Sequence, residues 1–320
     1  MGDGQASGIG IAIIGYGAIA DFHAEALQAA GANLLVVAGP KQEQAADFAR
    51  RHGIAAVETD PMRAIRAPGV DAVVIASPSG VHAEQARAGL ATGRHVLVEI
   101  PLALSLPESD ALVEQAAAAK RTLMVCHTLR YWQPFLASRE AMRGGGWRAT
   151  NVIARGLSRR HENVGWTGRQ RSWTDDLLWH HGGHIVDAVL GFLDAPITEV
   201  EATAGPVWVG SGLPMDYAIA LRTSEGAVAS ISLSYNARLG VGDYTIVGEQ
   251  DTIVISGAEA RSADGPIGAT ESVADAQERA IHAQDRDFLE SIASGRRPVA
   301  DAASILPTMR VLQAVWDRVG

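Results

Sequence analysis

Lysine is scarce in this chain. Of its 27 basic residues only Lys41 and Lys120 are lysines, and the other 25 are arginines. A mechanism that needs a lysine as acid, base or Schiff-base amine must therefore use one of these two. The single cysteine, Cys126, excludes an intramolecular disulfide and a cysteine-rich metal site. No apolar run approaches the ~20 residues that a membrane span needs.

Excess positive charge is also absent. The chain has 36 acidic against 27 basic residues and a net charge of −9, which argues against nucleic acid or a membrane surface as a partner. The apolar run Ile9–Ile14 has no basic flank and leads into a glycine turn, so we expect no signal peptide. With 47% hydrophobic residues, the chain can build a full core, and its 320 residues suggest two domains or one large one. The lack of a signal peptide, a membrane span and a disulfide leads us to expect a cytoplasmic protein.

Short apolar runs alternate with Ala-rich helical stretches in the first 125 residues. The runs are Ile9–Ile14, Leu34–Ala38, Ala72–Ala76, His95–Val98 and Leu123–Cys126. Continuous apolar strands separated by helices predict right-handed βαβ units and a parallel sheet buried on both faces. We therefore predict a Rossmann domain over residues 1–125.

The composition changes after residue 125, and all seven tryptophans lie beyond residue 131. Alternating runs around a Ser-Glu-Gly turn at Ser224–Gly226 predict a hairpin. We predict further strands at 243–247 and 252–256 and helices at 275–294 and 301–319. The fold class is thus α/β, with residues 126–320 forming a C-terminal α+β domain on a largely antiparallel open sheet.

A glycine-rich turn follows the first predicted strand. Gly15-Tyr16-Gly17-Ala18-Ile19-Ala20 reads G-x-G-x-x-A, in which the first glycine permits a tight turn and the second admits a pyrophosphate. The following helix N-terminus offers N–H groups to that phosphate. We predict dinucleotide contacts from Gly15, Gly17, Ala18 and Ile19.

The second strand ends in Ala38-Gly39-Pro40-Lys41, without the acidic residue that usually binds the ribose of NAD. Lys41 could instead meet a 2′-phosphate, which favours NADP over NAD, unless Lys41 is only a solvated loop charge. The next two strands end beside further candidate cofactor residues, because ligands of parallel sheets bind at carboxyl ends of strands. These residues are Ser77, Pro78, His82, Glu99, Ile100 and Pro101.

Together these residues resemble the glucose-fructose oxidoreductase / inositol dehydrogenase (Gfo/Idh/MocA) family over nearly the whole chain. The family's Glu-Lys-Pro turn corresponds to Glu99-Ile100-Pro101, and its G-x-H-x-x-D helix to Gly182–Asp187. A Gly-Arg-x-Pro break follows at Gly295–Pro298. The resemblance implies a Rossmann fold and nicotinamide-dependent oxidation.

Two positions depart from the family pattern. Its lysine is replaced by Ile100, and the acidic residue four before its histidine is replaced by His180. Four stretches, with a Trp-His-His string at Trp179–His181, resemble a branch of NADP-dependent semialdehyde dehydrogenases of aromatic catabolism. That branch implies oxidation of a cyclic hemiacetal dicarboxylate to a lactone. The loop ending in Lys41 departs from the branch, which carries Ser-Arg there.

Histidine is the side chain whose pKa starts closest to neutrality, so it is the natural base here. His180, His184 and Asp187 stand at i, i+4 and i+7 and would share one face of an α-helix, with His181 pointing elsewhere. The resemblance makes His184 the first choice for the base and His180 the alternative or its partner. Both could instead be core residues. A zinc site at this pair is not favoured, because the flanking Glu of a metalloprotease helix is missing.

Arginines crowd residues 155–171, where Glu162 is the one acidic residue. They suit a dicarboxylate clamp, with a solvated loop or salt bridges between subunits as alternatives. The candidate substrate-binding residues are His127, Arg130, Arg160, Arg171 and Trp173. The leading hypothesis is a hemiacetal dehydrogenase. The alternatives are a sugar or polyol dehydrogenase and a non-catalytic dinucleotide sensor. We expect a small-molecule dicarboxylate substrate and a homodimer or homotetramer.

Overall fold

The computed structural model describes residues 8–162, 176–268 and 271–319. They form two compact units. Unit 1 contains residues 8–126 and 281–305, and unit 2 contains residues 127–162, 176–268, 271–280 and 306–319. The division differs from a single boundary at residue 125, because residues 281–305 pack with the N-terminal part. In unit 1, for example, the Val125 N–H donates to the Ala300 carbonyl at 3.0 Å.

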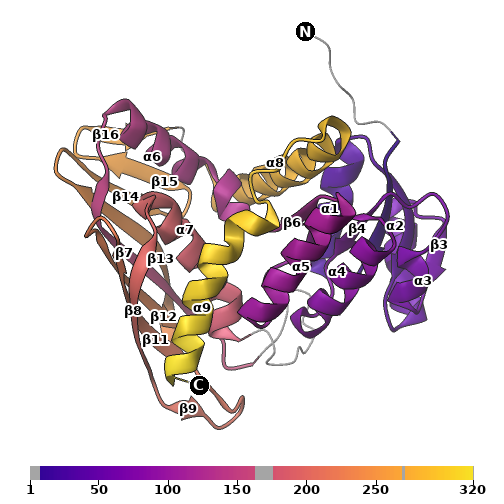
Figure 1. Cartoon of the computed structure of the whole chain (residues 1–320), viewed down its shortest axis with the longest axis horizontal. Helices are drawn as coiled ribbons and strands as arrows, with labels where there is room; N and C mark the ends of the chain where they lie inside the picture. Colours follow the sequence, from indigo (N-terminus) through magenta and orange to yellow (C-terminus); the bar gives the residue numbers. More distant parts are fainter. Residues whose placement is uncertain (1–7, 163–175, 269–270, 320) are drawn as a thin grey trace. The chain divides into compact units, whose positions relative to one another are not determined.

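Unit 1 is a six-stranded parallel sheet in the order β3-β2-β1-β4-β5-β6, with helices between the strands (Figure 1). This is the strand order of a Rossmann fold, the fold predicted for this part of the chain. Its strands are β1 Gly10–Ile14, β2 Asn33–Ala38, β3 Ala56–Glu58, β4 Ala72–Ile75, β5 His95–Val98 and β6 Leu123–Val125. Its complete helices are α1 Ala18–Ala29, α2 Gln42–His52, α3 Pro61–Ile65, α4 His82–Ala91 and α5 Leu106–Ala119. All residues of β1 and β4 are buried, as their continuous apolar sequences predict.

Unit 2 is built on an eight-stranded sheet in the order β16-β15-β14-β13-β7-β12-β11-β8. The pairing is antiparallel except between β7 and β12, which confirms the largely antiparallel prediction. Its strands are β7 Ala149–Arg159, β8 Ile197–Ala204, β11 Asp216–Thr223, β12 Val228–Ser234, β13 Asn236–Gly248, β14 Thr252–Ser256, β15 Glu259–Ser262 and β16 Gly265–Ile267, with a separate pair β9 Val207–Trp208 and β10 Leu213–Pro214.

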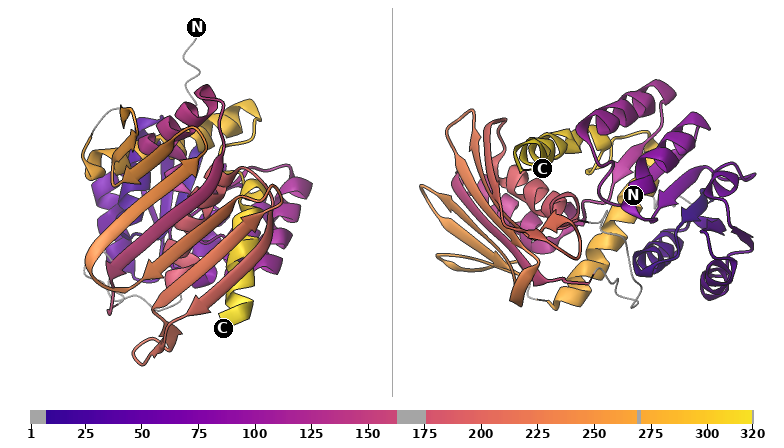
Figure 2. Two further views of the ribbon diagram at one scale, coloured as in Figure 1. Left: turned by 90° about the vertical axis from the view of Figure 1, so that its left-hand side faces the viewer. Right: turned by 90° about the horizontal axis from the view of Figure 1, so that it is seen from below.

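The helices of unit 2 lie on one face of this sheet, as the views in Figure 2 show for α6, α7 and α9. Their bounds are α6 Gln133–Gly144, α7 Gly183–Leu193 and α9 Leu306–Val319, and α8 Val273–Ser294 begins in unit 2 and continues into unit 1. None of the helices of the described ranges is both long and apolar enough to cross a membrane.

Three elements differ from the sequence-based expectation. The edge strand β3 was not predicted, because its sequence, Ala-Val-Glu, contains no continuous apolar run. Strand β13 is 13 residues long instead of five, because it pairs with both β7 and β14. The last helix begins at Leu306 and follows a 3₁₀ turn at Ala302–Ile305.

Candidate active site and cofactor turn

The two glycines of the predicted phosphate turn have different structural roles. Gly15 has φ +115°, and a Cβ there would lie 2.3 Å from the Ala76 carbonyl oxygen, so only glycine fits. Gly17 is the N-cap residue of α1, and a Cβ added to it would meet nothing within 4 Å. No side chain caps this helix end. Open space in front of an uncapped helix N-terminus fits the pyrophosphate of a dinucleotide.

Tyr16 packs against the end of β2, where a ribose would bind. A Cβ on Gly39 would lie 2.1 Å from the Tyr16 ring, and the Tyr16 hydroxyl accepts the Lys41 N–H at 3.1 Å. Lys41 is exposed and precedes α2 as its N-cap residue. Sequence reasoning does not single out Tyr16, because the motif accepts any residue at this x position.

The loops after β4 and β5 are joined by buried side chains. The two ring nitrogens of His82 lie 2.8 Å from the Pro101 and the Ser77 carbonyl oxygens. His82 is only 1% exposed. Its two contacts hold the loop after β4 and the loop after β5 together. The structure therefore brings the predicted residues Ser77, His82 and Pro101 to one edge of the sheet. Pro78 lies in the first of these loops.

Glu99 holds its own turn in place. Its Oε1 lies 2.9 Å from Nε2 of His23 on α1, and its Oε2 accepts the Ile100 N–H at 3.3 Å. Ile100, which replaces the family lysine, is 3% exposed, and the Ile100–Pro101 peptide is cis. His23 was missed by sequence reasoning. The detectable signal was a histidine on the apolar face of α1, beside the buried residues Ala20 and Leu27.

The histidines of unit 2 form a cluster, but not on a regular α-helix. Leu177–Gly182 is a π-helix that leads into α7, so the predicted i, i+4, i+7 face of one α-helix is wrong. The rings nevertheless remain neighbours. The centroid of the His184 ring lies 6.4 Å from that of His180 and 5.8 Å from that of His127. His127 is buried, whereas His180 and His184 are partly exposed.

The buried Asp187 carboxylate lies beside this cluster and contacts residues around it. Its carboxylate accepts two bonds from Arg130, at 2.8 and 2.6 Å, and one from the Thr308 hydroxyl at 3.0 Å. His127 Nδ1 lies 3.5 Å away. Burial raises the pKa of Asp187, but the charges of His127 and Arg130 outweigh it and hold the pKa well below its usual value. Arg130, a predicted substrate residue, therefore commits two of its N–H groups to an internal carboxylate.

A second group surrounds Tyr235. The Arg160 guanidinium lies 5.4 Å from the Tyr235 ring centroid and donates to its hydroxyl at 3.2 Å. The His181 ring centroid is 5.3 Å from that of Tyr235 and 4.9 Å from that of His180, so His181 does not point away from the cluster. Burial, then the charges of Arg160 and His184, lowers the pKa of His181 to about 4. His181 is therefore neutral at pH 7.

The other arginines of residues 155–171 are either on the sheet or outside the described residues. Arg155 lies on the sheet and forms a two-pronged pair with Asp243, which commits it to a surface salt bridge. Arg171 and Trp173, with the neighbouring Arg169, lie outside the described residues. Arg159 ends β7, and Arg160 lies beside Tyr235.

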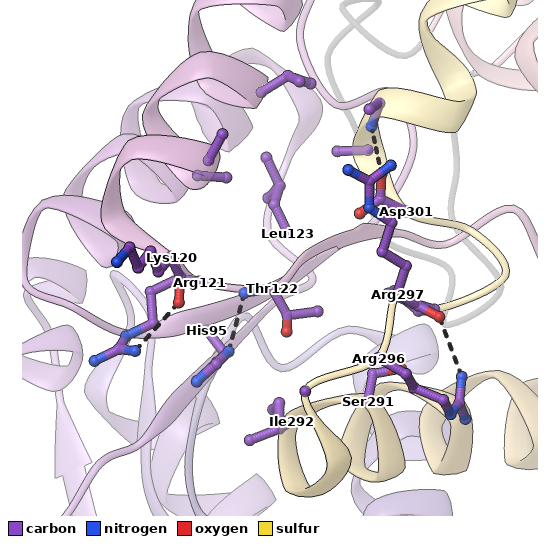
Figure 3. A pocket seen from close by; sticks show the side chains of 17 residues that line it. His95, Lys120, Arg121, Thr122, Leu123, Ser291, Ile292, Arg296, Arg297 and Asp301 are labelled. Atoms are coloured by element: carbon purple, nitrogen blue, oxygen red, sulfur yellow. Dashed lines mark hydrogen bonds between the residues drawn. The ribbon is translucent and has the colours of Figure 1, made fainter.

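A cavity of about 340 Å³ in unit 1 lies at the opposite edge of the sheet, where β5 and β6 begin (Figure 3). Lys120, Arg121 and Arg296 line it, at the C-terminal ends of α5 and α8. Cations are stabilised there by the helix dipoles. Burial, then the charge of Arg121, lowers the pKa of His95 in this cavity to about 4. The cavity is therefore not the nucleotide site, because the glycine turn lies at the carboxyl edge of the strands.

Unit 1 with its glycine turn is thus a dinucleotide-binding domain of the oxidoreductase type. Residues 9–127 match the model of the oxidoreductase family with an NAD-binding Rossmann fold, and residues 139–270 match the model of the C-terminal region of bacterial oxidoreductases. The chain belongs to the Gfo/Idh/MocA family of oxidoreductases.

Curated relatives extend over most of the chain. It is 32% identical to 4-carboxy-2-hydroxymuconate-6-semialdehyde dehydrogenase of Sphingobium sp. strain SYK-6, across 94% of this chain and 96% of that one. It is 30% identical to inositol 2-dehydrogenase of Acidothermus cellulolyticus, across 77% and 72%. Among solved structures, an oxidoreductase from Agrobacterium radiobacter in complex with NAD⁺, L-tartaric acid and magnesium superimposes with a TM-score of 0.85. It is 20% identical, with 97% of this chain and 96% of that one covered, and supports the fold alone.

Proposed function

We propose that this protein is a dehydrogenase that oxidises the cyclic hemiacetal of 4-carboxy-2-hydroxymuconate-6-semialdehyde to the lactone 2-pyrone-4,6-dicarboxylate. The observation that carries the proposal is the cluster of His127, His180 and His184, in a chain whose family lysine is the buried Ile100. The relative of that name, at 32% identity over nearly the full length, supports the same substrate.

The reaction removes a hydride from the hemiacetal carbon and a proton from its hydroxyl. When bound at the glycine turn, a nicotinamide cofactor would accept the hydride. His184 would take the proton, because a hemiacetal hydroxyl is more acidic than that of a simple alcohol and suits a neutral imidazole. The Asp187 carboxylate, held by Arg130, stabilises positive charge in the cluster as the proton arrives.

Arg160 is the proposed contact for a substrate carboxylate. Its guanidinium donates one bond to the Tyr235 hydroxyl and lies over that ring. The planar fork of an arginine matches the geometry of a carboxylate. Neutral His181 beside it adds no charge that would compete for the carboxylate. Arg171 and Trp173 are retained as proposed substrate contacts from the sequence alone.

The proposed cofactor is NADP, with NAD as the alternative. Lys41 is exposed at the N-cap of α2, and β2 ends in Ala38 without an acidic side chain. A 2′-phosphate beside Lys41 would form a charge-assisted contact there. Replacing Lys41 by Ala should therefore weaken NADPH binding about tenfold and leave NADH binding within twofold. Equal losses for the two cofactors would contradict NADP preference.

The decisive assay mixes protein, the semialdehyde and NADP⁺ and follows the appearance of reduced cofactor. Replacing His184 by Asn should lower kcat by about 10²–10⁴-fold, the usual contribution of a general base. His95→Asn is the matched control, because an asparagine oxygen accepts the same Thr122 N–H and the residue lies at the other edge of the sheet. If His184→Asn and His180→Asn each turn over at the wild-type rate, the base assignment is wrong.

A sugar or polyol dehydrogenase is the second candidate, favoured by the inositol 2-dehydrogenase relative. Inositol and glucose tested under the same conditions distinguish it, since Ile100 presents an apolar side chain where a polyol enzyme of this family uses an ammonium. Turnover of inositol with no turnover of the semialdehyde would replace the first proposal by the second.

We also propose that the protein works in the cytoplasm as a homodimer or homotetramer. Within the described residues of unit 2, the helices lie on one face of the eight-stranded sheet, and the exposed Ile153 and Val228 lie on its strands. A second copy would cover this open face. Light scattering coupled to gel filtration measures the mass, and a monomer at micromolar concentration would refute the assembly.

A further inference from the structure

A buried group of ionisable side chains in unit 1 has no part in the chemistry proposed so far. His23 on α1 is 0% exposed and lies between two carboxylates. Its Nδ1 is 2.7 Å from Asp285 Oδ2 on α8, and its Nε2 is 2.9 Å from Glu99 Oε1. Cys126 Sγ, just after β6, lies 3.9 Å from the same Nε2. Four elements of unit 1 therefore meet at one imidazole.

A metal ion is the first explanation to test, because His23, Glu99 and Cys126 place one donor atom each within 4.8 Å of one another. Tetrahedral zinc with Zn–N and Zn–O bonds of about 2.0–2.2 Å separates its nitrogen and oxygen ligands by about 3.4 Å. The observed separation of His23 Nε2 and Glu99 Oε1 is 2.9 Å, a hydrogen-bond distance. A proton therefore fits between these atoms better than zinc does.

Both nitrogens of His23 face carboxylate oxygens, which accept and do not donate. An imidazole can satisfy both only as the imidazolium, with an N–H on each nitrogen. Burial by itself lowers the pKa of His23, but the charge of Asp285 outweighs it and raises the pKa well above the ordinary value. Cys126 stays a thiol, because burial and then the Glu99 charge raise its pKa. Gln284, on the same helix, donates to Asp285 at 3.3 Å.

The consequence reaches the turn after β5. Glu99 uses one carboxylate oxygen on His23 and the other on the Ile100 N–H, so the turn is fixed through this side chain. The same imidazolium belongs to α1, the helix whose N-terminus follows the glycine turn. One buried cation thus links the proposed phosphate turn to the proposed nicotinamide turn. Its position is set by a carboxylate from residues 281–305.

We propose that His23 is a positioning residue, which holds the Glu99–Pro101 turn in register with the glycine turn through Glu99 and thereby sets the affinity for the nicotinamide cofactor. The inference rests on the assignment of this turn to the cofactor site. Its test reads binding of NADPH and not turnover, so it stands or falls separately from the choice of substrate.

The test is a double-mutant cycle of His23→Leu and Glu99→Gln, measured by NADPH fluorescence titration and by urea unfolding without cofactor. We expect His23→Leu to raise the Kd for NADPH about tenfold. In the Glu99→Gln background the same change should raise Kd less than twofold, because the contact through which His23 acts is already weakened. A residue that only packs would have the same effect in both backgrounds.

A second variant covers the case in which His23→Leu does not fold. Asp285→Asn keeps the shape but removes the charge that holds the second proton, so the ratio of its Kd to that of wild type should rise between pH 6.5 and 9. Asp287→Asn is the matched control on the same helix. Asp287 binds the Val299 N–H at 2.7 Å and Arg296, so its loss should lower stability without a pH-dependent ratio. Additive effects in the cycle, a flat Asp285→Asn ratio, or one zinc per chain by elemental analysis would each overturn the proposal.

Discussion

Replacing Asp187 by Asn tests how unit 2 holds its histidine cluster. Asp187 is 3% exposed and carries the charge opposite Arg130, whose side chain is 14% exposed. Asparagine leaves the Arg130 guanidinium buried without its counter-charge, and breaking a buried pair on one side costs about 3–5 kcal/mol. For a unit of this size, that corresponds to a fall in Tm of roughly 6–20 °C.

The loss should also depend on pH. The pKa of Asp187 is held below its ordinary value, so its contribution to stability is fully present above the unfolded pKa near 4 and is lost as pH falls below it. Wild type and Asp187→Asn should therefore converge in stability as pH falls from 5 towards 2. Urea unfolding followed by tryptophan fluorescence at a series of pH values measures this difference.

Asp243→Asn is the matched control. Asp243 makes the same two-pronged contact with an arginine, Arg155, but on the exposed surface of the sheet, where solvent screens the pair. Its replacement should change the unfolding midpoint little. Replacing Arg130 by Met and Asp187 by Leu together should recover part of the loss, because no buried charge then remains. Equal unfolding midpoints for Asp187→Asn and Asp243→Asn would refute the reasoning.

Two further predictions concern other parts of the chain. Gly17→Ala should fold with an unchanged Tm, because its Cβ meets open space, yet should weaken NADPH binding at least tenfold; normal NADPH affinity in this variant would contradict the phosphate site. Gly15→Ala should lose stability, because its Cβ would lie 2.3 Å from the Ala76 carbonyl oxygen. Because the pKa of His181 is lowered to about 4, the unfolded chain binds a proton at this residue before the folded chain does. The free energy of unfolding should therefore fall by up to about 1.4 kcal/mol per pH unit between about pH 6.5 and 4. Urea unfolding of His181→Gln at a series of pH values should lack this contribution.

The amino-acid pattern was sufficient for the Rossmann sheet and for the type of the second domain. Buried parallel strands need continuous apolar runs, and β1, β2, β4, β5 and β6 each have one. The edge strand β3 does not, because its three residues are exposed or half-buried and need no continuous apolar surface. The glycine turn was also legible in the sequence, since its conformational demands are local.

Side-chain pairs between residues far apart in the sequence could not be predicted from local patterns. The pairing of His23 with Glu99 and Asp285 joins positions separated by 76 and 262 residues, and no local rule links them. Arg130 looked like a free cation for a substrate carboxylate, yet Asp187, 57 residues later, occupies two of its N–H groups. The π-helix at Leu177–Gly182 was not predicted either, and it places His180 outside the regular α-helix that carries His184 and Asp187.

The sequence by itself determined the Rossmann class, the glycine turn and the absence of a lysine at residue 100, because each depends on local conformation or on residue identity. Only the tertiary structure decided which charges are already paired, because pairing depends on the packing of distant segments. It decided that Arg130 pairs with Asp187, that Arg155 pairs with Asp243 on the sheet surface and that the buried His23 of α1 lies between Glu99 and Asp285.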